Sequence, residues 1–268
     1  MMNEPGRSLW TGALTFGLVV LPVKMYTATS THDLSFRQVH NADGARINYK
    51  RVCSADGREV PYADVAKGYE GPDGTITVLT DSDLEGLPLA STKAINVTQF
   101  CSPADIDPLL LDKSYYLLPG TAGGGPYALL AEALHRTGLA GVCTVAIRKR
   151  ETVALLTETG GVLVLRLLLW EDEVKRIQAP DAPEASPALI GQALALIEVM
   201  TDKFDPAAYS DHYAEALQSV VDAKLAGTPQ PTAPPAGTEA ASALAITDML
   251  AASVTAAKAA RAKKGKTA

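Results

Sequence analysis

Residues 139–169, LAGVCTVAIRKRETVALLTETGGVLVLRLLL, form the stretch of sequence that decides the fold class. Aliphatic and β-branched residues predict strands at Leu139–Arg150, Thr152–Thr157 and Val162–Leu169. The pair Gly160-Gly161 predicts a tight hairpin between the last two strands, because glycine suits both central positions of a two-residue turn. This part of the chain is therefore expected to be β-structure with short connections.

The same kind of pattern extends towards the N-terminus. Leu14, Phe16, Leu18 and Val20 alternate with other residues. Further β-rich runs cover Ile47–Arg51, Thr75–Leu79, Lys93–Phe100 and Ser114–Leu118, and the turn Gly71-Pro72-Asp73-Gly74 precedes the second of them. Strands this numerous and this regularly spaced predict a barrel or a sandwich.

Helical signals appear once between two predicted strands and then again after the last strand. Pro126 suits the first turn of a helix that Gly138 is expected to end. After residue 180 the hydrophobic period changes from about 2 to about 3.6 residues. Ser186-Pro187 predicts the start of one helix, and Gly227 predicts the end of the next.

These patterns divide the chain into four expected parts within a mixed β and α fold class. Residues 1–180 form the β core, residues 181–227 a helical arm, and residues 228–241 a Pro-rich linker. Residues 242–268 combine a short amphipathic segment with a basic tail. That segment is too small to fold by itself.

Charge is unevenly distributed along the chain. The formal net charge of −6 and the pI near 5.3 argue against a nucleic-acid partner. However, residues 254–268 carry five cations and no acid, namely Lys258, Arg261, Lys263, Lys264 and Lys266. Further cations cluster at Arg46, Lys50 and Arg51, at Lys67, and at Arg148, Lys149 and Arg150. A focused positive surface on an acidic protein is therefore possible.

The sequence lacks the common motifs of catalysis and of metal binding. It contains no phosphate-binding GxxxxGK[ST], GxSxG, HExxH or GxGxxG pattern, so we expect a binding protein without a cofactor or a metal site. Asp105, Asp107 and Asp112 are the candidates for a metal cluster, but Asp105-Ile106-Asp107-Pro108 is better explained by a capping turn that starts a strand. Cys53, Cys101 and Cys143 are expected to be buried, inert thiols. With apolar stretches too short to cross a bilayer, the protein is expected to be soluble and cytoplasmic.

Several blocks of the sequence, taken together and in order, resemble the bacterial Ku family of non-homologous end joining. The most specific is the opening run 7–26, RSLWTGALTFGLVVLPVKMY. The others are Leu34–Phe36 with Val39-His40, Arg46–Cys53, Lys67–Glu70, Ile106–Pro108, Asp112–Pro119, and Tyr127–Leu130 with Glu132–Leu134. They cover about residues 7–225, and Asp248–Val254 followed by Lys and Arg is similar to the ends of actinobacterial Ku proteins.

The resemblance implies a homodimer whose β-barrels and bridging segments close into a ring around duplex DNA. It also implies non-catalytic, sequence-independent binding of double-strand-break ends and recruitment of the ATP-dependent ligase D. Such a protein would act at the nucleoid. Some relatives carry CxxC where this chain has Cys53-Ser54-Ala55-Asp56, so a metal role of that pair is not carried over.

Candidate DNA-binding residues are chosen by charge clustering and by motif position. They are Arg46, Lys50, Arg51, Lys67, Arg148, Lys149 and Arg150, with a solvated outer face as the alternative for each cluster. The tail cations Lys258, Arg261, Lys263, Lys264 and Lys266 are expected to make a modest contribution.

An apolar face on a tethered segment suits folding upon binding a partner. Leu244, Met249, Leu250 and Val254 are therefore expected to dock the ligase, with a frayed tail as the alternative. The runner-up function is an architectural protein that coats duplex DNA without needing an end. An end-processing nuclease comes third.

Overall fold

The computed structural model describes residues 6–31, 33–85, 93–120, 123–147, 150–181, 184–229 and 252–256. Its contacts divide the chain into two units, Met1–His32 with Phe36–Arg176, and Asp33–Ser35 with Ile177–Ala268. Each unit is described here by itself. Among the described residues, no helix is both long enough and apolar enough to span a membrane.

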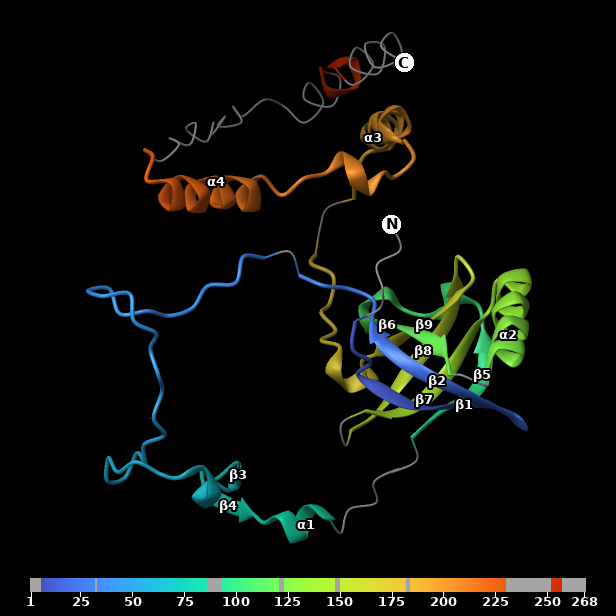
Figure 1. Ribbon diagram of the computed structural model, residues 1–268. Coiled ribbons are helices and arrows are strands. Elements are labelled where there is room, and N and C mark those ends of the chain that lie inside the picture. The colour runs from blue at the N-terminus through green and yellow to red at the C-terminus, as the bar shows by residue number, and fades with distance from the viewer. Residues whose placement is uncertain are drawn as a thin grey trace. The chain divides into compact units, whose positions relative to one another are not determined.

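The first unit contains a closed barrel in the strand order β1-β2-β6-β9-β8-β7-β5 (Figure 1). Its strands are β1 (Trp10–Phe16), β2 (Val19–Thr27), β5 (Ala94–Cys101), β6 (Leu111–Pro119), β7 (Ala140–Ile147), β8 (Arg150–Thr159) and β9 (Val162–Leu168). Neighbouring strands are antiparallel except β1 and β5, whose parallel pairing closes the barrel. The mixed β and α class and the barrel are thus confirmed, and the sandwich is excluded.

Alternating side chains fill the barrel interior. In β2, Leu21, Val23 and Met25 are buried whereas Pro22 and Lys24 are exposed, as a strand with one face on the core requires. The same core contains Leu14, Ile95, Leu117, Cys143, Leu156, Leu163 and Leu165, all buried. Burial raises the pKa of the Cys143 thiol to about 12. Cys53 and Cys101 are only half-buried, so the expectation of burial is wrong for these two.

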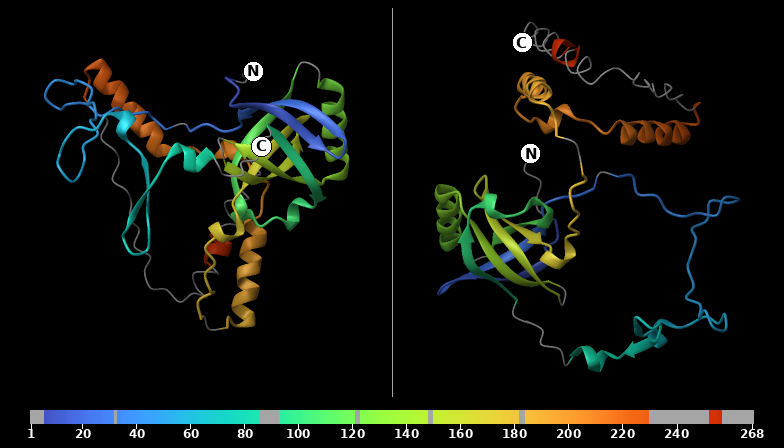
Figure 2. Two further views of the ribbon diagram at one scale, coloured as in Figure 1. Left: turned by 90° about the horizontal axis from the view of Figure 1, so that it is seen from below. Right: turned by 180° about the vertical axis from the view of Figure 1, so that it is seen from behind.

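The helix α2 (Gly124–Thr137) packs against the barrel through Tyr127, Leu130, Ala131 and Leu134 (Figures 1 and 2). It contains Pro126 in its first turn and ends at Gly138, whose φ of 64° is the left-handed conformation expected there. Both helix signals in the sequence are confirmed. The β8–β9 hairpin is confirmed as well, since Thr159 pairs with Val162 around Gly160 and Gly161, both with positive φ.

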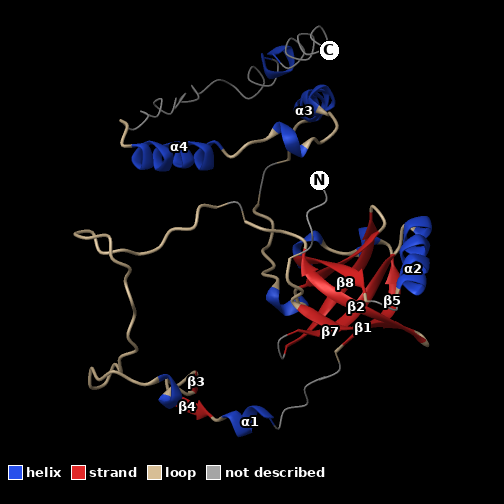
Figure 3. Cartoon of the chain, viewed as in Figure 1, coloured by secondary structure: helices blue, strands red, loops and turns tan. Residues whose placement is uncertain are grey.

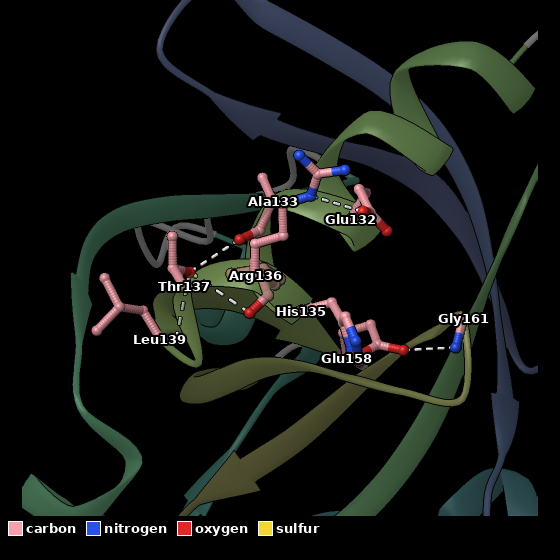
Figure 4. A network of polar contacts seen from close by, with 9 residues as sticks. Glu132, Ala133, His135, Arg136, Thr137, Leu139, Glu158 and Gly161 are labelled. Atoms are coloured by element: carbon pink, nitrogen blue, oxygen red, sulfur yellow. Dashed lines mark hydrogen bonds and ion pairs between the residues drawn. The ribbon is translucent and has the colours of Figure 1, made fainter.

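Polar contacts tie the end of α2 to the β8–β9 hairpin (Figure 4). The His135 ring lies 2.9 Å from the Glu158 carboxylate, which also accepts the Gly161 N–H. The Gly161 N–H and then His135 hold the pKa of Glu158 below its ordinary value. On the helix itself, Arg136 pairs with Glu132 at 2.7 Å.

At residues 139–150 and 47–51, the strands of the structure differ from those predicted (Figure 3). The run 139–150 is not one strand, because β7 ends at Ile147, β8 begins at Arg150, and these two residues pair with each other. Ile47–Arg51 contains no strand, although it lies between the isolated bridges Val39–Arg46 and Val52–Glu59. Among the described residues, only the two ends of the run have backbone partners, because the Ile47 N–H donates to the Gln38 carbonyl and the Arg51 carbonyl accepts the Val60 N–H. No partner strand therefore lies along it.

Short 3-10 turns surround the predicted capping acids. Asp105 and Ser102 cap the turn Pro103–Asp105 reciprocally, and Asp107 accepts the Leu109 N–H at the start of Pro108–Leu110. The capping interpretation of these acids is confirmed. Within the described part of the chain, no three His, Cys, Asp or Glu residues gather as a metal site.

The second unit contains the helices α3 (Pro187–Met200) and α4 (His212–Ala226). Ser186 caps α3 by accepting the Leu189 N–H, and Gly227 ends α4 with a φ of 67°. Both boundaries agree with their sequence signals. All described residues of 177–229 are exposed or half-buried, so these helices lack a core within one chain.

The hydroxyl of Tyr127 generates a prediction about stability. It donates to the Leu117 carbonyl at 2.7 Å and accepts the Leu163 N–H at 2.8 Å, and so bridges β6 and β9 from α2. Tyr127→Phe leaves both backbone groups without this partner and should lower the free energy of unfolding by about 1–3 kcal/mol in urea denaturation. Tyr116→Phe, at a 41% exposed position of β6, is the control and should change it by less than about 0.5 kcal/mol. Equal stability of the two variants would contradict the bridging role.

Candidate nucleic-acid interface

A long excursion, residues 28–93, connects β2 to β5. Trp10 in β1 pairs with Met25 near the end of β2, and Ala13 in β1 pairs with Ala94 at the start of β5. The excursion therefore leaves and re-enters the barrel at the same end, on either side of β1. Strand spacing and rise put its two attachment points only about 20 Å apart.

The described part of the excursion has local order but no core. It contains the hairpin of β3 (Lys67–Glu70) and β4 (Ile76–Leu79) and the short helix α1 (Asp81–Glu85). Every residue of 33–84 is exposed or half-buried. The exposed ones include large apolar side chains, among them Phe36, Tyr49, Tyr62, Tyr69 and Ile76 at 63–76%. Such a surface is typical of a segment that is covered by a partner.

Two turns of the same design position the cations in the first half of the excursion. In His40–Gly44, the His40 N–H donates to Ala45 and the Gly44 N–H donates to His40. In Cys53–Gly57, the Cys53 N–H donates to the Arg58 carbonyl, and the Gly57 N–H donates to the Cys53 carbonyl. The fourth residue of each turn, Asp43 or Asp56, accepts a backbone N–H two residues further along the chain. The glycine that ends each turn has φ near 71°. Ala-Asp-Gly occurs in both turns, thirteen residues apart, and this repeat is the sequence signal for them.

The predicted cations near these turns are exposed, and two of them have partners. The Lys50 ammonium lies 2.7 Å from the Glu59 carboxylate, and the Arg51 guanidinium lies 4.9 Å from the centre of the Tyr62 ring. Arg46 follows the first turn, and Lys67 begins β3 opposite Leu79. In the part of the chain that the structure describes, neither Arg46 nor Lys67 has an ion-pair partner. These four residues thus share one excursion.

Of the third predicted cluster, Arg150 belongs to the barrel. Arg150 begins β8 and borders a hollow of about 220 Å³ together with Lys113 and Trp170. Asp112, Glu151 and Glu173 line the same hollow, so the local charge is mixed. Arg148 and Lys149 lie outside the described residues, and the prediction that the triplet acts together stays untested.

The two halves of the excursion carry opposite net charge, a feature that the search for cation clusters did not predict. Residues 36–58 contain five Lys or Arg and two Asp, whereas residues 59–85 contain one Lys and seven Asp or Glu. The first half therefore also adds Arg37 and Arg58, two cations that the motif blocks did not select. A polyanion would be attracted to the first half and repelled by the second.

Most of the predicted tail residues lie outside the described part of the chain. These are Leu244, Met249 and Leu250 in the apolar segment and Lys258, Arg261, Lys263, Lys264 and Lys266 in the basic tail. Val254 is described, in a helical stretch over 252–256, and is half-buried. Its predicted docking role therefore stays a prediction.

Comparison with known proteins identifies the family of this barrel. Residues 15–191 match the family described as the Ku70/Ku80 beta-barrel domain. A protein named Non-homologous end joining protein Ku, from Frankia casuarinae, is 44% identical over 95% of this chain, which spans 65% of that relative. A Saccharopolyspora erythraea protein, Non-homologous end joining protein Ku 2, is 45% identical over 85% of this chain and 76% of its own length.

A Mycobacterium tuberculosis relative, also named Non-homologous end joining protein Ku, is 40% identical over 82% of this chain and 84% of its own length. The family match begins near the end of β1 and covers the other six barrel strands and the excursion between β2 and β5. The sequence resemblance and the fold thus lead to the same assignment, and the chain belongs to the Ku family.

Proposed function

We propose that this protein binds the ends of double-stranded DNA in non-homologous end joining, as a homodimeric ring that threads onto linear duplex. The observation that carries the proposal is the excursion of residues 28–93. Its attachment points are about 20 Å apart, a distance that six or seven extended residues would span. Connections longer than about 15 residues in a compact domain are usually functional. The length of this excursion therefore supports a role in enclosing a ligand.

The exposed apolar surface supports a homodimer. In α3, the side chains of Ile190, Leu194, Ile197 and Met200 are 47–67% exposed. Together with the apolar side chains of the excursion, they need a cover that one chain does not supply. A second copy of the chain would bring the same apolar surfaces and could cover them, and twofold symmetry would close two excursions into a ring.

Charge distribution supports backbone contacts rather than recognition of bases. Phosphate contacts release condensed counterions and carry no sequence information, and a dimer doubles each of them. Arg46, Lys50, Arg51 and Lys67 on the excursion are the proposed contacts, and Arg148, Lys149 and Arg150 extend them from the barrel. Apart from Lys67, the charged side chains of the acidic second half of the excursion would face away from the duplex. A protein of this kind would concentrate at the nucleoid.

This chain would bind DNA ends without carrying out a reaction and without a cofactor. Joining would be carried out by the ATP-dependent ligase D, recruited through Leu244, Met249, Leu250 and Val254. The tail cations Lys258, Arg261, Lys263, Lys264 and Lys266 would add screened attraction to DNA. An architectural protein that grips duplex from the side is the alternative, and the topology of the DNA substrate separates the two.

The Lys50–Glu59 pair generates a prediction about DNA affinity. Glu59→Gln should strengthen binding at about 0.15 M salt, because it frees the Lys50 ammonium for phosphate. Lys50→Gln should weaken binding and reduce the salt slope by roughly 2 per dimer, at about 0.9 for each lost phosphate contact. Fluorescence anisotropy of a labelled duplex measures both. Arg136→Gln removes a similarly paired cation from α2 and is the matched control. The same slope in Lys50→Gln and Arg136→Gln would exclude Lys50 from the interface.

A second prediction concerns DNA ends. The purified protein should be retained on a linear duplex and released from a covalently closed minicircle of the same sequence at about 0.15 M salt, because a ring needs an end to enter. Light scattering of the same sample should give twice the chain mass of 28.1 kDa. Equal retention on both DNAs would support the architectural alternative, and a monomer mass would exclude the ring.

A third prediction concerns the ligase. A chain truncated after Gly227 should bind linear DNA but lose stimulation of ligase D, because it lacks the apolar docking segment. A chain truncated after Ala256 keeps that segment and lacks all five tail cations, so it should still stimulate the ligase. Unchanged stimulation after truncation at Gly227 would contradict docking through this segment, and nick-sealing assays report the outcome.

A further inference from the structure

A cation–π contact on the excursion joins Arg51 to Tyr62. The central carbon of the Arg51 guanidinium lies 4.9 Å from the centre of the Tyr62 ring, inside the range in which the ring attracts a cation. Both residues are exposed, and the Tyr62 side chain is 76% exposed. A free arginine side chain at such a position samples many rotamers, so the ring restricts a side chain that is otherwise mobile.

Local backbone hydrogen bonds bring these two side chains together, although eleven residues separate them in the sequence. The Val60 N–H donates to the Arg51 carbonyl at 2.8 Å, so the chain that follows the second turn runs back beside Arg51. Pro61 then leads into the 3-10 turn Tyr62–Asp64. The position of the ring therefore depends on nearby backbone geometry and needs no hydrophobic core.

Arg51 differs from the other two cations beside this turn. The Lys50 ammonium lies 2.7 Å from the Glu59 carboxylate, and the Arg58 Nε lies 3.6 Å from the Asp56 carboxylate. In the described part of the chain, no carboxylate pairs with Arg51. Stacking on a ring uses the face of the guanidinium and leaves the N–H donors at its edge free, because they lie in the plane of the group. Arg51 therefore keeps its donors for an anion.

We propose that Tyr62 is a positioning residue, which holds the Arg51 guanidinium in the conformation that contacts a DNA phosphate. The inference rests on the proposed function, because it takes DNA as the ligand. A planar guanidinium can donate two parallel hydrogen bonds to one phosphate, and this geometry requires a defined orientation.

The expected size of the effect follows from how often Arg51 has that orientation before DNA arrives. Affinity is proportional to the fraction of molecules in the conformation that binds. A cation–π contact at an exposed site is strong enough to raise this fraction roughly threefold. A homodimer has two such contacts, so together they would raise its affinity about tenfold.

Substitutions of Tyr62 test the proposal by fluorescence anisotropy of a labelled linear duplex at about 0.15 M salt. Tyr62→Leu removes the ring and should weaken binding about tenfold. Tyr62→Phe keeps an aromatic face and should bind within about twofold of the parent protein. Tyr69→Leu is the matched control and should leave the affinity unchanged, because Tyr69 is 63% exposed and no cation of the described residues lies over its ring.

Salt dependence separates a positioning residue from a residue that contacts phosphate. Arg51→Gln should reduce the salt slope by roughly 2 per dimer, at about 0.9 for each lost contact. Tyr62→Leu should keep the parent slope, because Arg51 still contacts the phosphate in the complex. In the Arg51→Gln background, Tyr62→Leu should cause no further loss, since the ring acts through Arg51.

Four outcomes would overturn the proposal. Unchanged affinity in Tyr62→Leu would show that the ring does nothing for binding, and equal losses in Tyr62→Leu and Tyr62→Phe would assign the effect to the hydroxyl. A further loss on adding Tyr62→Leu to Arg51→Gln would mean that the ring acts by itself or that the whole turn is disturbed. An unchanged slope in Arg51→Gln would exclude Arg51 from the interface. In all four cases the parent protein still binds linear duplex, whereas failure of the proposed function appears as a parent protein that does not.

Discussion

Closure of the barrel by the parallel pairing of β1 with β5 is the constraint on which the rest of the structure depends. A closed sheet has no free edge, so each of the seven strands pairs with a neighbour on both sides. Closure also leaves the end of β2 and the start of β5 at one end of the barrel, on either side of β1. The excursion of residues 28–93 is attached there, with a packed barrel as its base.

The barrel and the excursion meet opposite physical requirements. Inside the barrel, leucine, valine and isoleucine side chains are buried and contribute most of the free energy of folding. Along the described part of the excursion, similar side chains are exposed, and local turns, one hairpin and the short helix α1 supply order. A segment of this kind adds little to the folding free energy of a single chain. It is stabilised when a partner or a ligand covers its apolar side chains. The division of charge along it, basic before acidic, then favours one orientation towards a polyanion.

Much of the fold was predictable because local chemistry decided it. Gly160-Gly161 specified the β8–β9 hairpin, Gly138 specified the end of α2, and Ser186-Pro187 specified the start of α3, each through backbone conformations or caps that few other residues provide. Ile47–Arg51 was predicted to be a strand because its residues have high β propensity. The chain turns back on itself on either side of the run, at Asp43 and Asp56, and only the end residues Ile47 and Arg51 have backbone partners among the described residues. Residue propensity does not report whether a neighbouring strand is present.

The candidate site was less predictable from sequence. Charge clustering selected Lys50 and Arg51, but the ion pair with Glu59 and the contact with Tyr62 depend on how the second turn folds the chain back. The hollow that Arg150 borders combines residues from 112 to 173, which no sequence signal connects.

By itself, the sequence determined the family, the barrel and the helix boundaries, because motif blocks, alternation and caps are local properties. Tertiary structure decided which strands close the barrel, where the excursion begins and ends, and which cations have partners. Those features depend on contacts between residues far apart in the chain, whose geometry appears only when the barrel is closed.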